Sequence, residues 1–230
     1  MQKNIPLRRP LHWFSGGFLT ICVASLLALV QPAARAQQTQ DSAAVAPDAM
    51  VLALTTDVLK TISNDPALVK GDMPKMMALV DNKIMPNVNF VRMTSSAVGP
   101  GWRQATPEQR QRLQDEFKLL LIRTYAGALA QAPGVTAGIK PGRVDADARD
   151  VLIRTELSSK NTAQPIQMDY RLERNATAAS GWKIYNVNVM GIWLVETYRS
   201  QFAQEVNAHG IDGLIASLVE RNKAAATVKK

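Results

Sequence analysis

Residues 181–202 change their apolar period partway along, and this change constrains the fold more than any other stretch of the chain. Up to Val189, β-branched and aromatic residues are spaced as in a strand, whereas from Leu194 onward apolar residues recur at every fourth position. The first spacing is typical of a strand and the second of a helix. We therefore predict a strand that turns at Gly191 directly into a helix.

The two sides of this strand also indicate where it lies. Strict alternation places Trp182 and Ile184 on one side and Tyr185, Val187 and Val189 on the other. Apolar groups on both sides predict a strand that is covered on both faces. Such a strand belongs in the middle of a fold, so we expect the remaining elements to pack around it.

The beginning of the chain predicts a secretory signal peptide rather than part of the fold. A basic leader precedes an uncharged apolar run at residues 14–30, and Ala34-Arg35-Ala36 forms a small-x-small cleavage site. A membrane anchor is the alternative, but a run of 17 residues is at the short limit for a span and Pro32 follows it. We expect an exported mature chain that begins near Gln37, by either the general or the twin-arginine route.

Composition excludes several classes of function for the exported chain. Cys22 and His12 both lie in the leader, so the mature chain would hold no cysteine and a single histidine, His209. Disulfides, thiolate catalysis and cysteine or histidine metal sites are then excluded, and no metal or cofactor is predicted. Loss of the leader lowers the net charge from +8 to +4. These scattered charges do not form the basic stripe of a nucleic-acid-binding protein.

We divide the chain into a signal peptide (1–36), a flexible linker (37–47), a single domain (48–223) and a tail (224–230). Helical spacing predicts a first helix that ends before Asp65-Pro66 and a second, methionine-rich helix at residues 72–85. The methionines suit either an ordinary core or an adaptable wall for a flexible apolar ligand. A short helix or turn should then reach residue 98.

The clearest predicted helix begins at Thr106. Thr106 and Gln109 form a capping box around Pro107, and Pro133-Gly134 should end the helix after about residue 132. Its apolar side chains cover an unusually wide stripe. Such a face must lie against a large apolar surface.

Three alternating segments supply that surface. Residues 151–157, 166–172 and 182–189 read as strands joined by polar connectors, which predicts an antiparallel meander. A weaker strand is expected at residues 139–146. One face of this sheet is apolar and the other is charged, so helices should cover the apolar face. The fold class is therefore α+β.

Several short blocks resemble the MlaC-like "toluene tolerance" family in both order and spacing over residues 49–222. The blocks are Trp102-Arg103-Gln104-Ala105-Thr106-Pro107-Glu108-Gln109 with Phe117, Leu121, Thr124 and Tyr125, then Pro165-Ile166, Asp169-Tyr170, Gly181-Trp182-Lys183, Gly191, Tyr198-Arg199-x-x-Phe202 and Gly210-Ile211-Asp212. The chain departs from the family pattern at Asn89, Asn186 and Met190, where an acidic residue is usual, and at Trp193, where a small polar residue is usual.

The resemblance implies an NTF2-like α+β fold, in which a curved antiparallel sheet is covered on one face by several helices that enclose an apolar cavity. It also implies a soluble periplasmic carrier, not an enzyme, that shuttles phospholipid between the outer and inner membranes and maintains outer-membrane lipid asymmetry. Phospholipid would be its cargo and no cofactor would be needed. The implied partners are an outer-membrane lipoprotein complex and an inner-membrane MCE ring protein with its ABC transporter.

We predict that acyl chains contact the apolar face of the sheet and the helices over it. The predicted lipid-binding residues are Phe117, Leu120, Leu121, Tyr125, Val151, Ile153, Ile166, Met168, Tyr170, Val187, Val189, Ile192 and Tyr198. These side chains could equally fill a solid core, and sequence does not separate the two. For partner contacts near the cavity mouth, Arg92 and Arg103 are the first candidates, with solvated surface charges as the alternative.

Two other classes of function remain open. One is an isomerase or hydratase on the same fold, which would need an acid or base beside a pocket tyrosine. Asp169 and Tyr170 are the one suggestive pair, but neighbours in a strand point to opposite faces, so they should not share a site. The other is an adaptor that binds a partner and no ligand.

Overall fold

The computed structural model describes residues 45–145, 147–160 and 164–227, all of which belong to one unit of the chain, Asp41–Lys230. The predicted signal peptide and most of the predicted linker lie outside the described residues. The helices are α1 (Pro47–Asn64), α2 (Pro66–Val69), α3 (Met73–Leu79), the π-helical η1 (Val80–Ile84), the 3-10 helices η2 (Met85–Asn87) and η3 (Gly99–Arg103), α4 (Phe90–Val98), α5 (Pro107–Leu129) and α6 (Leu194–Thr227).

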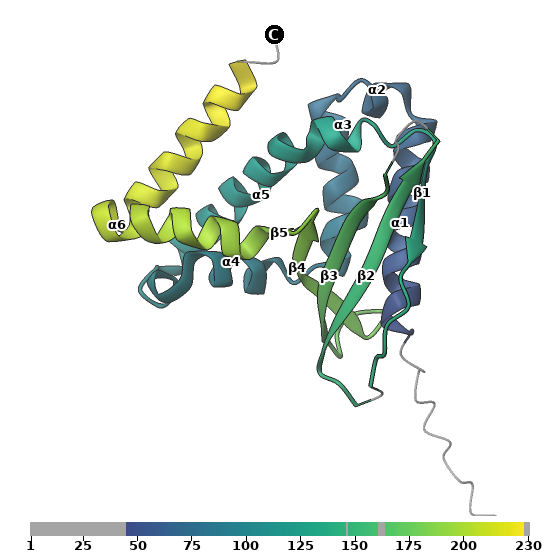
Figure 1. Ribbon diagram of the computed structural model, residues 1–230. Coiled ribbons are helices and arrows are strands. Elements are labelled where there is room, and N and C mark those ends of the chain that lie inside the picture. The colour runs from purple at the N-terminus through teal and green to yellow at the C-terminus, as the bar shows by residue number, and fades with distance from the viewer. Residues whose placement is uncertain (1–44, 146, 161–163, 228–230) are drawn as a thin grey trace, which may run out of the picture. The chain divides into compact units, whose positions relative to one another are not determined.

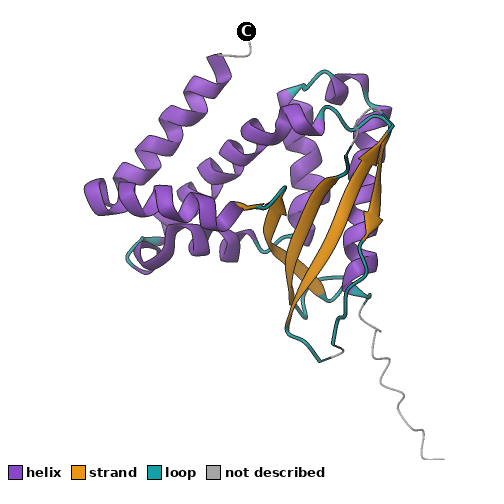
Figure 2. Ribbon diagram, viewed as in Figure 1, coloured by secondary structure: helices purple, strands orange, loops and turns teal. Residues whose placement is uncertain are grey.

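The strands form one antiparallel sheet in the order β1-β2-β3-β4-β5. They are β1 (Val135–Ile139), β2 (Asp150–Ser159), β3 (Ile166–Arg174), β4 (Trp182–Val189) and β5 (Ile192–Trp193). Figure 2 shows the twisted sheet beside the helices. Along β2, buried Val151 and Ile153 alternate with exposed Leu152 and Arg154, so the sheet has an apolar face and a polar face. The predicted α+β class and the meander are confirmed.

The helices divide between the two edges of the sheet. Helix α1 lies along β1 and β2, whereas α4 and α6 lie beside β4, and α5 packs against α3, α4 and α6 (Figure 1). The predicted capping box starts α5: Thr106 Oγ1 accepts from the Gln109 amide at 3.2 Å, and Gln109 Oε1 accepts from the Thr106 amide at 2.9 Å. Such a cap contributes about 1 kcal/mol and fixes where this long helix begins.

The switch from strand to helix falls where the sequence predicts it, because β4 and β5 lead into α6 at Leu194. The prediction that Ile184 lies on the opposite side of the strand from Val187 and Val189 is wrong. Leu172 pairs with Ile184 while Arg171 pairs with Asn186, so Tyr185 is an extra residue in β4 and forms a bulge. The bulge reverses the alternation, so Val187 and Val189 lie on the same face of the sheet as Ile184.

Three other boundaries differ from the predictions. The first strand is β1 at Val135–Ile139, not 139–146, because Pro141 lacks an amide proton and the chain leaves the sheet after Lys140. The second predicted helix is helical α3 only to Leu79, after which η1 and η2 complete the segment. At the end, α6 breaks at Gly210 (φ 70°, ψ −170°) and continues to Thr227, so helix extends into the predicted tail.

Two clusters of buried side chains form the core. The larger joins α4, the first half of α5 and α6 to the sheet; the smaller joins α1, α3 and the second half of α5. The wide apolar face of α5 is therefore shared among helices as well as facing the sheet: Leu113 and Phe117 enter the first cluster, and Ile122 and Ala126 enter the second. Leu54 of α1 packs against both.

Candidate functional site

The apolar face of the sheet changes from buried to half-buried along its strands. On β3, Leu172 and Tyr170 are buried, whereas Met168 and Ile166 are half-buried, and β2 and β4 show the same change toward the same end. We call the half-buried apolar side chains at this end, with two from α5, the apolar strip: Leu121, Tyr125, Leu157, Ile166, Met168, Val187 and Val189. All but Leu157 were predicted to bind lipid.

The strand register brings the members of the apolar strip together. Met168 lies opposite Val189, and Ile166 lies opposite Leu157. Residues opposite each other in antiparallel strands have Cβ atoms about 5 Å apart, so these side chains are direct neighbours. Leu121 of α5 packs against the core cluster that also contacts Met168. The alternation of β2 could have revealed Leu157 as a member, since it follows the buried residues at the same spacing.

The Tyr125 hydroxyl adds a polar group to the α5 side of the apolar strip. Burial, and to a smaller extent the nearby Tyr198, raise the pKa of Tyr125, so the phenol is neutral and can donate a hydrogen bond. Tyr125 is only half-buried, which leaves it accessible. An apolar surface with one phenol at its margin can hold hydrocarbon and orient a polar group beside it.

The other predicted lipid-binding residues lie in different surroundings. Phe117 and Tyr198 are buried in an aromatic cluster with Phe90 and Phe202, in which the Phe117 ring centroid lies 5.8 Å from Phe90, 5.0 Å from Tyr198 and 5.2 Å from Phe202. The remaining predicted residues Leu120, Val151, Ile153 and Tyr170 are buried as well, and Ile192 is exposed.

Tyr170 occupies the buried part of the sheet face and has neutral neighbours. Its hydroxyl lies 3.4 Å from Thr55 Oγ1 of α1 and 3.8 Å from the Met168 sulfur. Burial raises the pKa of Tyr170, so the phenol keeps its proton. Asp169 is opposite Arg154 and Asn188 on the other face, which confirms that Asp169 and Tyr170 do not share a site.

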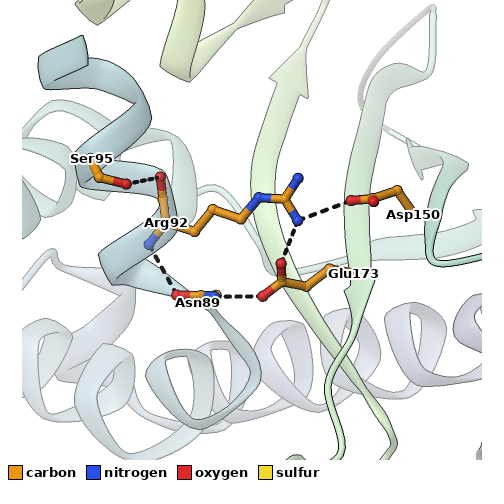
Figure 3. Close-up of polar contacts among 5 residues, drawn as sticks. All are labelled: Asn89, Arg92, Ser95, Asp150 and Glu173. Carbon is orange, nitrogen blue, oxygen red and sulfur yellow. Dashed lines mark hydrogen bonds and ion pairs between the residues drawn. The ribbon is translucent and has the colours of Figure 1, made fainter. Parts of the chain in front are cut away.

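Arg92 lies at the far end of the sheet from the apolar strip. Its Nη1 contacts Asp150 Oδ1 at 2.9 Å and also the Glu173 carboxylate, to which Asn89 donates a second hydrogen bond (Figure 3). The Arg92 guanidinium also lies 3.5 Å from the centroid of the Tyr185 ring, the residue of the bulge. Burial alone would lower the pKa of Arg92, but the hydrogen bonds to Glu173 and Asp150 raise it.

This Arg92 cluster (Asn89, Arg92, Asp150 and Glu173) ties α4 to the polar face of the sheet. Asn89 also caps α4, since its Oδ1 accepts from the Arg92 amide at 3.0 Å. Asp150 and Glu173 thus compensate the charge of Arg92 within the fold. This position differs from the predicted one near a cavity mouth. Arg103, the other candidate, has an exposed side chain at the end of η3.

Asn186 holds the start of α6 in place, a role that sequence reasoning missed. It is 2% exposed, its Oδ1 accepts from the Val195 amide at 3.2 Å, and its Nδ2 donates to Glu196 at 2.7 Å. Glu196 also pairs with Arg171 at 2.7 Å. Burial opposes the ionisation of Glu196, but the contacts with Asn186 and Arg171 outweigh it and hold the pKa of Glu196 below its usual value. An asparagine at a buried position between the apolar residues Tyr185 and Val187 was the available signal.

Two hollows open away from the α5 side chains of the apolar strip. One of about 360 Å³ lies between β2 and residues 139–145, with Val151 and Ile153 on its wall. Another of about 540 Å³ lies between α1 and residues 82–87, where Met50 and Leu54 form its apolar side. Within the described ranges, three or more metal-binding side chains do not gather at any point. The same part of the chain contains no helix that is both long and apolar enough to cross a membrane.

Comparison with known proteins places this geometry among phospholipid-binding proteins. The model of the MlaC protein family matches residues 53–220. The chain is 28% identical to the toluene tolerance protein ttg2D of Pseudomonas putida over 191 residues, which cover 80% of this chain and 86% of the relative. It is 25% identical to the intermembrane phospholipid transport system binding protein MlaC of Haemophilus influenzae, over 65% of this chain and 70% of that protein.

A solved structure supports the same assignment. It is that of a phospholipid-binding protein from Ralstonia solanacearum in complex with a phospholipid. The two chains are 46% identical, the TM-score is 0.73, and the match covers 78% of this chain and 98% of that one. The family match spans well over half of the chain, and the solved structure shares its fold. The chain therefore belongs to the MlaC family.

Proposed function

We propose that this protein is a periplasmic phospholipid carrier that holds acyl chains against the apolar strip. It would shuttle lipid between the outer and inner membranes and so maintain the lipid asymmetry of the outer membrane. The related protein from Ralstonia solanacearum was solved with a phospholipid, and the relative from Haemophilus influenzae is named as the binding protein of an intermembrane phospholipid transport system. Both support a binding and transport function, as opposed to catalysis.

The exposure of the apolar strip is the observation that carries this proposal. Leucine, valine, isoleucine and methionine are fully buried elsewhere in the core, yet at one end of the sheet the same residue types are half-buried. Each apolar Å² left in water forgoes about 25 cal/mol of burial free energy. A ligand of hydrocarbon would recover that energy, which is why an incompletely covered apolar face favours acyl chains.

The cargo itself requires such a surface. A diacyl phospholipid has on the order of 30 tail methylenes, and exposing each one to water costs about 0.8 kcal/mol. Free transfer through an aqueous compartment is therefore prohibitive without a carrier. The neutral surroundings of the Tyr170 hydroxyl, Thr55 and Met168, are compatible with hydrocarbon and offer no acid or base for catalysis.

The route and the partners follow from family membership and the leader sequence. We expect cleavage after residue 36, which would release the mature chain into the periplasm. The two docking partners would be an outer-membrane lipoprotein complex and an inner-membrane MCE ring protein with its ABC transporter. No cofactor is required for this function, because the phospholipid is cargo and is released unchanged.

Mass spectrometry of the exported protein tests this function. The full chain is produced with its own leader, purified from the periplasmic fraction without detergent, and analysed intact under native conditions and after solvent extraction. We expect a mature mass that begins near Gln37 and a bound phospholipid. A protein that retains residues 1–36 in the membrane fraction would refute the export route, and an exported protein without phospholipid would refute the carrier function.

A further inference from the structure

The turn between β4 and β5 carries two large apolar side chains in water. Met190 is 69% exposed and Ile192 is 57% exposed, the two highest values among the large apolar residues of the described ranges. They flank Gly191, so both lie at the end of the same hairpin. We call Met190, Gly191 and Ile192 the hairpin tip.

The hairpin tip has an unfavourable backbone conformation at Met190 and is held by two hydrogen bonds. Val189 and Ile192 pair across a two-residue turn in which both Met190 (φ 51°) and Gly191 (φ 88°) have positive φ, as a type I′ turn requires. Asparagine and glycine suit such positions, whereas methionine rarely adopts them. The Met190 amide donates to Gln167 O at 2.9 Å and the Gly191 amide donates to Asn188 Oδ1 at 2.8 Å. A strained, exposed and well-anchored methionine indicates a function.

The hairpin tip continues the apolar strip. Ile192 lies opposite Val189, which in turn lies opposite Met168, so the three side chains share one face of the sheet. On the other face, Trp193 lies opposite Asn188, and the Arg171 guanidinium lies 4.1 Å from the Trp193 ring centroid. The exposed apolar side chains thus lie next to a half-buried tryptophan and an arginine, residue types that suit a lipid–water boundary.

We propose that the hairpin tip inserts into the surface of a phospholipid bilayer and brings the apolar strip level with the acyl chains. This inference rests on the proposed function. Two side chains present far less than the roughly 1,000 Å² that a specific protein interface buries, but they suffice for a weak, reversible contact with lipid. The net charge of +4 expected for the mature chain adds attraction to an anionic surface. A transient contact suits a carrier that must leave the membrane again.

The turn offers a variant that separates insertion from folding. Met190→Asn removes the apolar side chain and supplies the residue that a type I′ turn accepts best, so the fold should be at least as stable as the wild type. Ile192→Thr removes the second apolar side chain and keeps a β-branched residue in the strand. Val91→Thr is the matched control, because Val91 is 53% exposed on α4 and does not belong to the hairpin tip.

The test measures how fast delipidated protein takes up a fluorescent phospholipid from vesicles of phosphatidylcholine and phosphatidylglycerol. We expect Met190→Asn with Ile192→Thr to lower the initial rate about tenfold, and Val91→Thr to leave it unchanged. Met190→Asn alone should still carry as much phospholipid out of the cell as the wild type, because the apolar strip is intact.

Several outcomes would overturn the inference. Equal rates for the wild type and the double variant would do so, as would an equal loss in Val91→Thr or a loss that appears only when membrane proteins are present in the vesicles. In each of these cases the wild type still carries lipid, so the proposed function stands. A wild type that neither carries lipid from the cell nor takes it up would instead refute the proposed function.

Discussion

The aromatic cluster and the apolar strip are built from similar residue types but differ in how completely they are covered. In the aromatic cluster, Phe117 contacts rings from α4 and α6 and is fully buried. In the apolar strip, Leu121, one turn further along the same helix, is only half-buried and packs against the same core cluster as Met168 and Val187. Adjacent turns of α5 therefore differ in burial: the turn with Phe117 packs in the core, and the turn with Leu121 is partly open to solvent.

This difference shows that incomplete burial is confined to one end of the sheet. Helices α4 and α6 close around Phe117, and the Arg92 cluster pins α4 to the sheet at the same end. The other end of the sheet, which includes Ile166 and Val189, carries less cover from the rest of the chain. We expect stability to be concentrated away from the surface that is proposed to bind lipid, as local stability differences in proteins allow.

The largest predicted effect on stability is at Phe117. Phe117→Ala should lower the free energy of unfolding by about 3–5 kcal/mol, because a fully buried ring leaves a cavity among its neighbours. Leu121→Ala should cost only about 1 kcal/mol, since its side chain is already partly in water. Urea unfolding of the lipid-free proteins measures both. Equal costs would break the distinction between the aromatic cluster and the apolar strip.

The next effect concerns the Arg92 cluster. Arg92→Met should lower the free energy of unfolding by about 1–2 kcal/mol, because Glu173 is poorly exposed and would lose its cationic partner. Arg103→Met is the control and should change stability by less than about 0.5 kcal/mol, as its side chain is exposed. Thermal unfolding followed by circular dichroism compares them. If Arg92→Met were as harmless as the control, the cluster would not secure α4.

The smallest effect is a pH dependence at the start of α6. The pKa of Glu196 is lowered in the fold, so its contribution is present above its unfolded pKa and is lost as the pH falls through the lower folded value. Glu196→Gln should therefore destabilise by a few tenths of a kcal/mol at about pH 7, and this deficit should shrink as the pH falls through the folded pKa. Glu220→Gln, at an exposed ion pair, is the control. A deficit that persists in acid would contradict this account.

Local signals predicted most of the fold. The capping box at Thr106, the alternation in β2 and β3 and the change of period before Leu194 each depend on neighbouring residues, and the structure confirms them. The bulge at Tyr185 could not be predicted, because it depends on the edge of β4, where the amide of Asn89 bonds Ile184 O at 2.8 Å. That single residue changed which side chains share a face.

The candidate site was predicted less completely, for a related reason. Periodicity identifies apolar side chains, but burial depends on which other elements cover them. The sequence therefore grouped Phe117 and Tyr198 with Met168 and Val187, although the structure separates the first pair into the aromatic cluster. Paired groups such as Arg92 escaped prediction because their partners, Asp150 and Glu173, are distant in sequence.

The most direct test of the carrier account places one charge on the apolar strip. Met168→Glu puts a carboxylate where acyl chains would lie, and an unpaired buried charge costs several kcal/mol or forces protonation. Gln167→Glu adds the same charge one residue away, at an exposed position on the opposite face. Native mass spectrometry, solvent extraction and melting curves are compared for the wild type and both variants.

The account predicts that Met168→Glu folds, with water against the apolar strip, but carries no phospholipid, while Gln167→Glu keeps the full wild-type complement. A Met168→Glu protein that retains its phospholipid would contradict the account. A wild type without lipid, together with a Met168→Glu protein that cannot fold, would show that these side chains form a solid core.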